Sequence, residues 1–116
     1  MQVQVRRQGD TAIISVSGEV DLYTSPEVRK AITQQSKKKV PLIVVNLADV
    51  EYMDSSGVAT LVEGMQLTGN YKGDFRLVGL QPMVREVFEL ARLDRVFSIF
   101  DNEEQAIQAR RLESNA

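Results

Sequence analysis

The stretch LIVVNLADVEYMDSSG at residues 42–57 decides the fold of this chain. Its first part, Leu42–Leu47, is almost continuously apolar, which predicts an interior strand buried on both faces. An amphipathic segment follows Gly57, so an acid and two hydroxyls lie where a strand turns into a helix. N–H groups at a helix start lack intrahelical partners and carry partial positive charge, which suits an anion. A serine at such a position can cap the helix or accept a phosphate.

The composition is that of a single globular domain. Of its 116 residues, 43% are hydrophobic and 26% are charged, and the formal net charge is −2. A net acidic chain argues against a nucleic-acid binder, whose footprint is basic. The absence of cysteine and histidine excludes disulfides, thiol and imidazole catalysis, and thiolate metal sites. There is no signal-peptide core and no apolar stretch of bilayer length, so we expect a cytoplasmic protein.

Strand and helix patterns alternate along the rest of the chain. Val3 and Val5 alternate with polar residues, and Ala12–Ser17 follows a turn at Gln8-Gly9-Asp10, which predicts a β-hairpin. After the strand–helix junction, the patterns predict a helix from Val58 to Gly69-Asn70 and a strand at Phe75–Gly79. A helix opened by Pro82 and a strand at Val96–Phe100 follow. The last predicted helix is capped by Asp101 or Asn102 and ends near Arg110 and Arg111.

The resulting order, β-β-α-β-α-β-α-β-α, predicts an α/β domain with an opening hairpin, four helices and a mixed, mostly parallel sheet. We expect the domain to span residues 1–111 and residues 112–116 to form a frayed tail. The expected inward face of the third helix consists of Val84, Val87, Phe88 and Ala91. The methionines expected to fill the core are Met53, Met65 and Met83.

The first helix has a clear start signal. Thr24 and Glu27 have capping-box spacing, and Tyr23 and Val28 are placed to form a hydrophobic staple. Its predicted inward face consists of Val28, Ala31, Ile32 and Gln35. The run Lys37-Lys38-Lys39 complements the negative end of the helix dipole, so we interpret it as a solvated terminus rather than an anion-binding patch.

Enzyme motifs are absent from the chain. It contains no GxxxxGK[ST] phosphate loop, no GxGxxG, no GxSxG and no HExxH. Asp21 and Asp54 both follow predicted strands and could form a carboxylate pair, but turn and capping roles are commoner for such residues. A receiver domain with Asp54 as phospho-acceptor is rejected, because the chain begins with a hairpin and follows its last strand with Asp101-Asn102-Glu103.

Capping alone explains the segment around Ser55 poorly. A cap needs one side chain, whereas Asp54, Ser55 and Ser56 offer three. Gly57 follows them, and glycine in a first helical turn costs about 1 kcal/mol relative to alanine. Such a glycine would let another backbone approach closely.

The segment Tyr52–Val58, with Gly18-Glu19-Val20-Asp21 upstream, resembles the STAS domain of bacterial anti-sigma factor antagonists. The resemblance covers nearly the whole chain. It implies that Ser55 is phosphorylated by a partner anti-sigma factor that is itself a serine kinase. It also implies that Asp21 and Asp54 are the acidic residues flanking the phosphosite.

The resemblance implies a binding module rather than an enzyme, with no cofactor, metal, nucleic-acid or membrane ligand. The unphosphorylated form would bind the kinase and free a sigma factor, and a PP2C-type serine phosphatase would reset the phosphorylated form. We expect a monomer or weak dimer. The expected partner-binding residues are Asp21, Tyr23, Thr24, Asp54, Ser56 and Gly57. One alternative is a STAS accessory subunit of a lipid-transport or other transporter complex; another is a small nucleotide-binding protein or hydrolase, although it would lack a phosphate loop.

Overall fold

The computed structural model describes residues 1–109. Its elements are β1 (Gln2–Gln8), β2 (Thr11–Val20), α1 (Ser25–Lys37), β3 (Leu42–Met53), α2 (Ser55–Gly69), β4 (Asp74–Val78), α3 (Pro82–Leu90), β5 (Ser98–Phe100) and α4 (Glu103–Gln108). The element order predicted from the sequence is confirmed. The predicted helix end at Arg110 and Arg111, and the tail at residues 112–116, lie outside the described residues.

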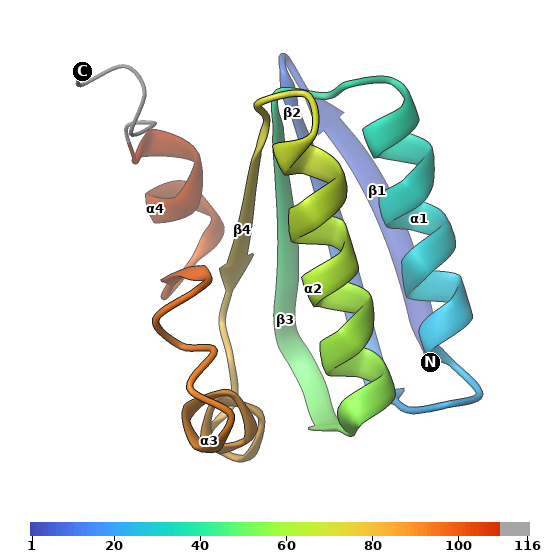
Figure 1. Cartoon of the computed structure of the whole chain (residues 1–116), viewed down its shortest axis with the longest axis vertical. Helices are drawn as coiled ribbons and strands as arrows, with labels where there is room; N and C mark the ends of the chain where they lie inside the picture. The colour runs from blue at the N-terminus through green and yellow to red at the C-terminus, as the bar shows by residue number, and fades with distance from the viewer. Residues whose placement is uncertain (110–116) are drawn as a thin grey trace.

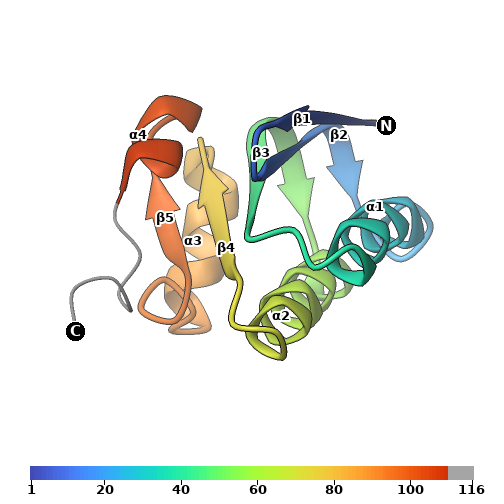
Figure 2. The ribbon, with the colours of Figure 1, turned by 90° about the horizontal axis from the view of Figure 1, so that it is seen from above.

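One mixed sheet carries the fold, with its strands in the order β1-β2-β3-β4-β5. β1 runs antiparallel to β2, and the remaining neighbours pair in parallel. α1 and α2 lie side by side on one face, whereas α4 lies on the opposite face (Figures 1 and 2). α3 joins the first face, because its Val84 and Phe88 belong to the same apolar core as α1 and α2.

A smaller core lies under α4, and a buried arginine completes it. Arg76 in β4 is only 5% exposed. Its guanidinium donates to the carbonyl oxygens of Ala106 and Ala109, at 2.5 and 2.8 Å, and to the Asp74 carboxylate at 3.4 Å. A cation beside the last carbonyls of a helix complements their partial negative charge. Arg76 therefore holds the end of α4 against the sheet.

β3 is longer than the sequence predicts, since it continues past Leu47 to Met53. Strict alternation beyond Leu47 would turn Asp49 and Glu51 toward the core. Instead Leu47, Val50 and Met53 are buried, and the two acids are exposed. Two register shifts between β2 and β3 accompany this spacing of three. β3 thus keeps its apolar residues in the core after the alternation fails.

The predicted capping box and hydrophobic staple at the start of α1 are wrong. Thr24 occupies the N-cap position but makes no side-chain capping bond. Its hydroxyl instead donates to the Glu19 carbonyl at 2.8 Å and accepts from the Asp21 amide at 2.9 Å. Tyr23 is 87% exposed and forms no staple with Val28. The loop before α1 therefore uses Thr24 for its own geometry rather than for the helix.

Most predicted inward faces are confirmed, with exceptions near the C-terminal half. The confirmed face of α1 consists of Val28, Ala31, Ile32 and Gln35. In α3, Val84 and Phe88 are buried, whereas Ala91 lies beyond the helix end and is exposed. Met83 is exposed, so it is not core filler. β5 begins later than predicted, and Val96 is exposed outside it.

Two glycines of α2 form a matched pair for testing the packing of this helix. A Cβ at Gly64 would lie 2.8 Å from the Phe75 ring and 3.0 Å from Ile32, whereas a Cβ at Gly69 would meet no atom within 4 Å. We predict that Gly64→Ala lowers the free energy of unfolding by about 1–3 kcal/mol through overpacking. Gly69→Ala should leave it unchanged or raise it by up to about 1 kcal/mol. Urea unfolding followed by circular dichroism measures both, and equal effects would contradict the packing argument.

Candidate functional site

The carboxyl ends of β2 and β3 bring the predicted site residues together. Val20 pairs with Met53 across the parallel strands, and the Asp54 amide donates to the Val20 carbonyl at 3.2 Å. Asp21 and Asp54 are the next residues along their strands, so both acids lie at the same edge of the sheet. This is the edge where ligands of open α/β sheets bind. Ser55 begins α2 at this edge.

Asp54, not Ser55, caps α2. Its Oδ1 accepts from the Ser56 amide at 2.8 Å and from the Gly57 amide at 3.3 Å, and its backbone is extended as an N-cap requires. Ser55 is therefore the first helical residue, and its side chain is exposed. Within residues 1–109 its hydroxyl makes no hydrogen bond. The capping interpretation of Ser55 is wrong, and the structure leaves this hydroxyl without a role in the fold.

Gly57 supports the site from below. A Cβ there would lie 2.6 Å from Met53 Cγ and 2.9 Å from Val20 Cγ1. The close neighbours are therefore side chains, and the expected approach of another backbone is wrong. Gly57 is buried, so it does not lie on the surface that a partner would contact. Its lack of a side chain lets the first turn of α2 settle onto the two strand ends.

Asp21 organises the loop between β2 and α1. Its Oδ1 accepts from the Tyr23 amide at 2.9 Å and from the Thr24 amide at 3.0 Å. Desolvation raises the pKa of the Asp21 carboxyl, but the hydrogen bonds from Thr24 and Tyr23 together outweigh it and hold the pKa below its ordinary value of 3.8. An ionised carboxylate thus fixes the loop that carries Tyr23.

Three apolar or aromatic side chains are exposed around this edge. Leu22 is 66% exposed, Tyr23 87% and Tyr52 43%. Tyr52 pairs with Glu19 across β2 and β3, one residue before the strands end at Val20 and Met53. Sequence reasoning named Tyr23 but missed Leu22 and Tyr52. The only local signal was that these large apolar residues lie beside a turn and do not follow helical spacing. Exposed aromatic residues are enriched at protein–protein interfaces.

The charge at this edge is one-sided. Residues 8–28 include β2 and the loop after it, and residues 40–71 include β3 and α2; neither segment contains lysine or arginine. Their acids next to the two strand ends are Glu19 and Asp21 at the end of β2 and Glu51 and Asp54 at the end of β3. Arg29 of α1 is ion-paired with Glu63 of α2 at 2.9 Å. A phosphate on Ser55 would therefore lie at the positive end of the α2 dipole but would face no basic side chain from these two segments.

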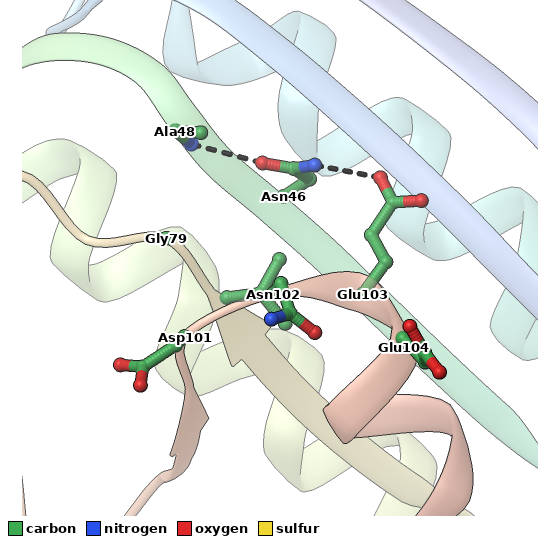
Figure 3. A pocket seen from close by; sticks show the side chains of 8 residues that line it. Asn46, Ala48, Gly79, Asp101, Asn102, Glu103 and Glu104 are labelled. Carbon is green, nitrogen blue, oxygen red and sulfur yellow. Dashed lines mark hydrogen bonds between the residues drawn. The ribbon is translucent and has the colours of Figure 1, made fainter.

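A separate pocket lies between β3, β4 and the start of α4 (Figure 3). Its polar side chains already serve the fold, because Asn46 bonds Glu103 at 2.6 Å and Asn102 caps α4 through the Gln105 amide at 2.9 Å.

In the described part of the chain, no three acidic side chains gather as metal ligands would. No helix within residues 1–109 is long and apolar enough to cross a membrane.

The chain belongs to the STAS domain family, because residues 2–106 match that family. An anti-sigma-B factor antagonist of Listeria monocytogenes is 30% identical over 93 residues, which are 80% of this chain and 82% of the relative. The crystal structure of an anti-sigma factor antagonist from Mycobacterium paratuberculosis is similar, with a TM-score of 0.84 at 28% identity, covering 91% of this chain and 90% of that one. The phosphorylated form of the Bacillus cell fate determinant SpoIIAA has a TM-score of 0.74 at 26% identity, covering 91% of this chain and 96% of that one.

The cap assignment at α2 is testable by stability. Asp54→Ala should lower the free energy of unfolding by about 1 kcal/mol, because two amides of the first turn lose their acceptor. Asp54→Asn keeps an acceptor oxygen and should cost clearly less. Ser55→Ala, the matched control, should leave stability within about 0.5 kcal/mol of the parent, as expected for a surface substitution. A larger loss for Ser55→Ala than for Asp54→Ala would show that the serine is the cap.

The state of Asp21 is testable by pH. Its folded pKa lies below the unfolded value, so the ionised form stabilises the fold above the unfolded pKa, and this stabilisation is lost as pH falls through the folded pKa. Asp21→Asn, which cannot ionise, should therefore be less stable than the parent at neutral pH. The difference should shrink between about pH 5 and pH 2. Urea unfolding at several pH values measures it, and a difference independent of pH would contradict the assignment.

Proposed function

We propose that this chain is an anti-sigma factor antagonist that works by partner switching in the cytoplasm. In its unphosphorylated form it binds a serine-kinase anti-sigma factor, and the sigma factor is released. The kinase then phosphorylates Ser55, and the antagonist dissociates. A PP2C-type serine phosphatase removes the phosphate and returns the antagonist to its binding form. In this cycle the chain is a substrate and binding module rather than an enzyme.

The observation that carries the proposal is that Ser55 is exposed and its hydroxyl makes no hydrogen bond in the described structure. It is exposed at the first position of α2, and the cap that a serine commonly provides comes from Asp54 instead. The hydroxyl makes no hydrogen bond within the described residues, so it can be modified without loss of a contact that holds the fold. Asp21, Tyr23 and Thr24 lie on the neighbouring loop and would form part of the docking surface.

The proposed switch acts by charge and bulk at the interface. A phosphate on Ser55 adds about −1.5 to −2 charges beside Asp54. The N-terminus of α2 tolerates negative charge, so the fold persists. A partner that packs closely against a neutral hydroxyl would lose that contact, because the added group is both larger and charged. Discrimination by an added repulsive element is a general route to specificity.

The relatives support the same reading. The similar proteins from Listeria monocytogenes and Mycobacterium paratuberculosis are both described as anti-sigma or anti-sigma-B factor antagonists. The structure of SpoIIAA is described as a phosphorylated form. In this chain the exposed serine at the helix start lies at the positive end of the α2 dipole, which favours an added phosphate.

Phosphorylation is tested with the cognate kinase and ATP. We expect one phosphate per chain, on Ser55, by intact-mass measurement and phosphopeptide mapping. Ser56→Ala is the matched control, since Ser56 is the neighbouring hydroxyl and should be dispensable for the modification. Mapping to Ser56 or Thr24 would show that the assignment is wrong.

The charge mechanism is tested in the same system. Ser55→Asp should weaken kinase binding by at least about tenfold in calorimetry while keeping the parent circular dichroism spectrum and a similar Tm, because a helix N-terminus accepts the charge. Ser55→Ala should bind and resist release. If the parent is not phosphorylated and Ser55→Asp binds normally, the accessory-subunit alternative is favoured instead.

A further inference from the structure

We infer that Asn46 and Gln81 are positioning residues for Ser55. They lie on β3 and at the start of α3, away from the phosphosite along the chain. Both hold a bulge at Leu47-Ala48 in β3, which supplies one of the two extra residues that set where the end of β3 stands relative to β2. The inference rests on the proposed function only for its kinase measurement.

The register between β2 and β3 shows what the bulge does. Ser15 pairs with Asn46 and Val20 pairs with Met53, so β2 advances five residues while β3 advances seven. Without the two extra residues, Val20 would face Glu51 instead. Ser55 would then stand two residues further on, about 6.6 Å at 3.3 Å per residue. The irregular register therefore places the phosphosite beside the loop that carries Tyr23.

The first extra residue is held by side chains rather than by the strand ladder. Two residues, Leu47 and Ala48, oppose Val16 of β2. The Ala48 amide donates to Asn46 Oδ1 at 2.9 Å, and the Ala48 carbonyl accepts from Gln81 Nε2 at 2.7 Å. Both backbone groups of the bulge residue are thus satisfied by carboxamides. A backbone group without a partner would favour a different register.

The carboxamide of Asn46 is itself held in place. Its Nδ2 donates to Glu103 Oε2 at 2.6 Å, and Glu103 is also ion-paired with Arg6 of β1. Figure 3 shows Asn46 between Ala48 and Glu103, with the backbone at Gly79 close by. A Cβ at Gly79 would lie 2.9 Å from the Ala48 Cβ, so the β4–α3 connection closes over the bulge. Elements from both sides of β3 therefore hold Ala48 in place.

Loss of the hydrogen bonds to Ala48 should make the end of β3 open more easily, while residues 42–46 are affected less. The body of β3 pairs with both β2 and β4 through residues 42–46, whereas beyond residue 46 no pairing with β4 continues. The bonds from the Asp54 amide to Val20 and from the Ser56 amide to Asp54 lie beyond the bulge. Their opening should become easier when Ala48 loses a partner, while Val45 stays protected.

The first experiment measures amide hydrogen exchange in the full chain. Gln81→Met removes the donor to Ala48 and no cap, since Gln81 makes no side-chain capping bond. Asn46→Ala removes the acceptor. We expect the Asp54 and Ser56 amides to exchange about tenfold faster in each variant, with Val45 unchanged. Gln34→Met, on the exposed side of α1, is the matched control. Unchanged exchange at both amides, or equally faster exchange at Val45, would overturn the inference.

A rescue separates the individual bond from general destabilisation. Asn46→Asp keeps the acceptor for Ala48 but places a carboxylate against Glu103. Combining it with Glu103→Gln restores a donor and an acceptor in exchanged positions. The double variant should return exchange at Asp54 to within about twofold of the parent, whereas Asn46→Asp alone should not. Failure of the double variant to improve on Asn46→Asp would overturn the role of the Asn46–Glu103 contact.

The kinase measurement links the bulge to function. Gln81→Met should lower kcat for phosphorylation of Ser55 about tenfold with KM within about twofold, because a misplaced acceptor slows the reaction more than docking. An unchanged kcat would overturn the positioning role. If the parent itself is not phosphorylated, the proposed function fails, and the exchange experiment still decides the inference on the bulge.

Discussion

The hydrogen bond from the Asp54 amide to the Val20 carbonyl is the contact on which the site depends. It joins the last residue of β2 to the residue that follows β3 and so brings the loop after β2 next to the start of α2. Asp21 and Ser55 are far apart along the chain, and this pairing places both at the same edge of the sheet. Gly57 allows the first turn of α2 to rest on Val20 and Met53. A bulky residue there would push the helix start away from the strand ends.

The residues around Ser55 each have a different structural role. Asp54 caps α2, and Asp21 closes the loop before α1. Gly57 provides room for the packing below. The Ser55 hydroxyl makes no hydrogen bond in the described structure, which suits a residue whose chemistry changes during a cycle. A domain of this size is stable by only about 5–15 kcal/mol, so a switch that altered the cap itself would remove a sizeable fraction.

Sequence patterns predicted the elements well and their ends less well. The interior strand was recognised from its apolar run, but its predicted end at Leu47 is wrong. Beyond Leu47 the alternation fails, and Asp49 and Glu51 are typical of a loop. The structure continues the strand because two extra residues let Val50 and Met53 face the core while both acids stay exposed. The register of β3 against β2 cannot be predicted from any local sequence pattern.

The same limit applies to the site. The acid and hydroxyls at the strand–helix junction were recognisable, because helix starts have local signals. Which side chain caps the helix was not, since Asp54, Ser55 and Ser56 are all suitable. The exposure of Tyr23 was also not predictable: its spacing to Val28 suits a staple, but the bonds of Asp21 hold the loop in another shape.

The sequence by itself determined the order of strands and helices, the single α/β domain and a serine at the start of a helix. These follow from the period of apolar residues and from turn and capping residues, which act over a few positions. Only the tertiary structure decided the register of β2 against β3, the two hydrogen bonds that Asn46 and Gln81 make to Ala48, and the placement of Asp21 and Ser55 at one edge of the sheet. These depend on contacts between residues far apart in the chain, where a shift of two positions moves a side chain by about 6.6 Å.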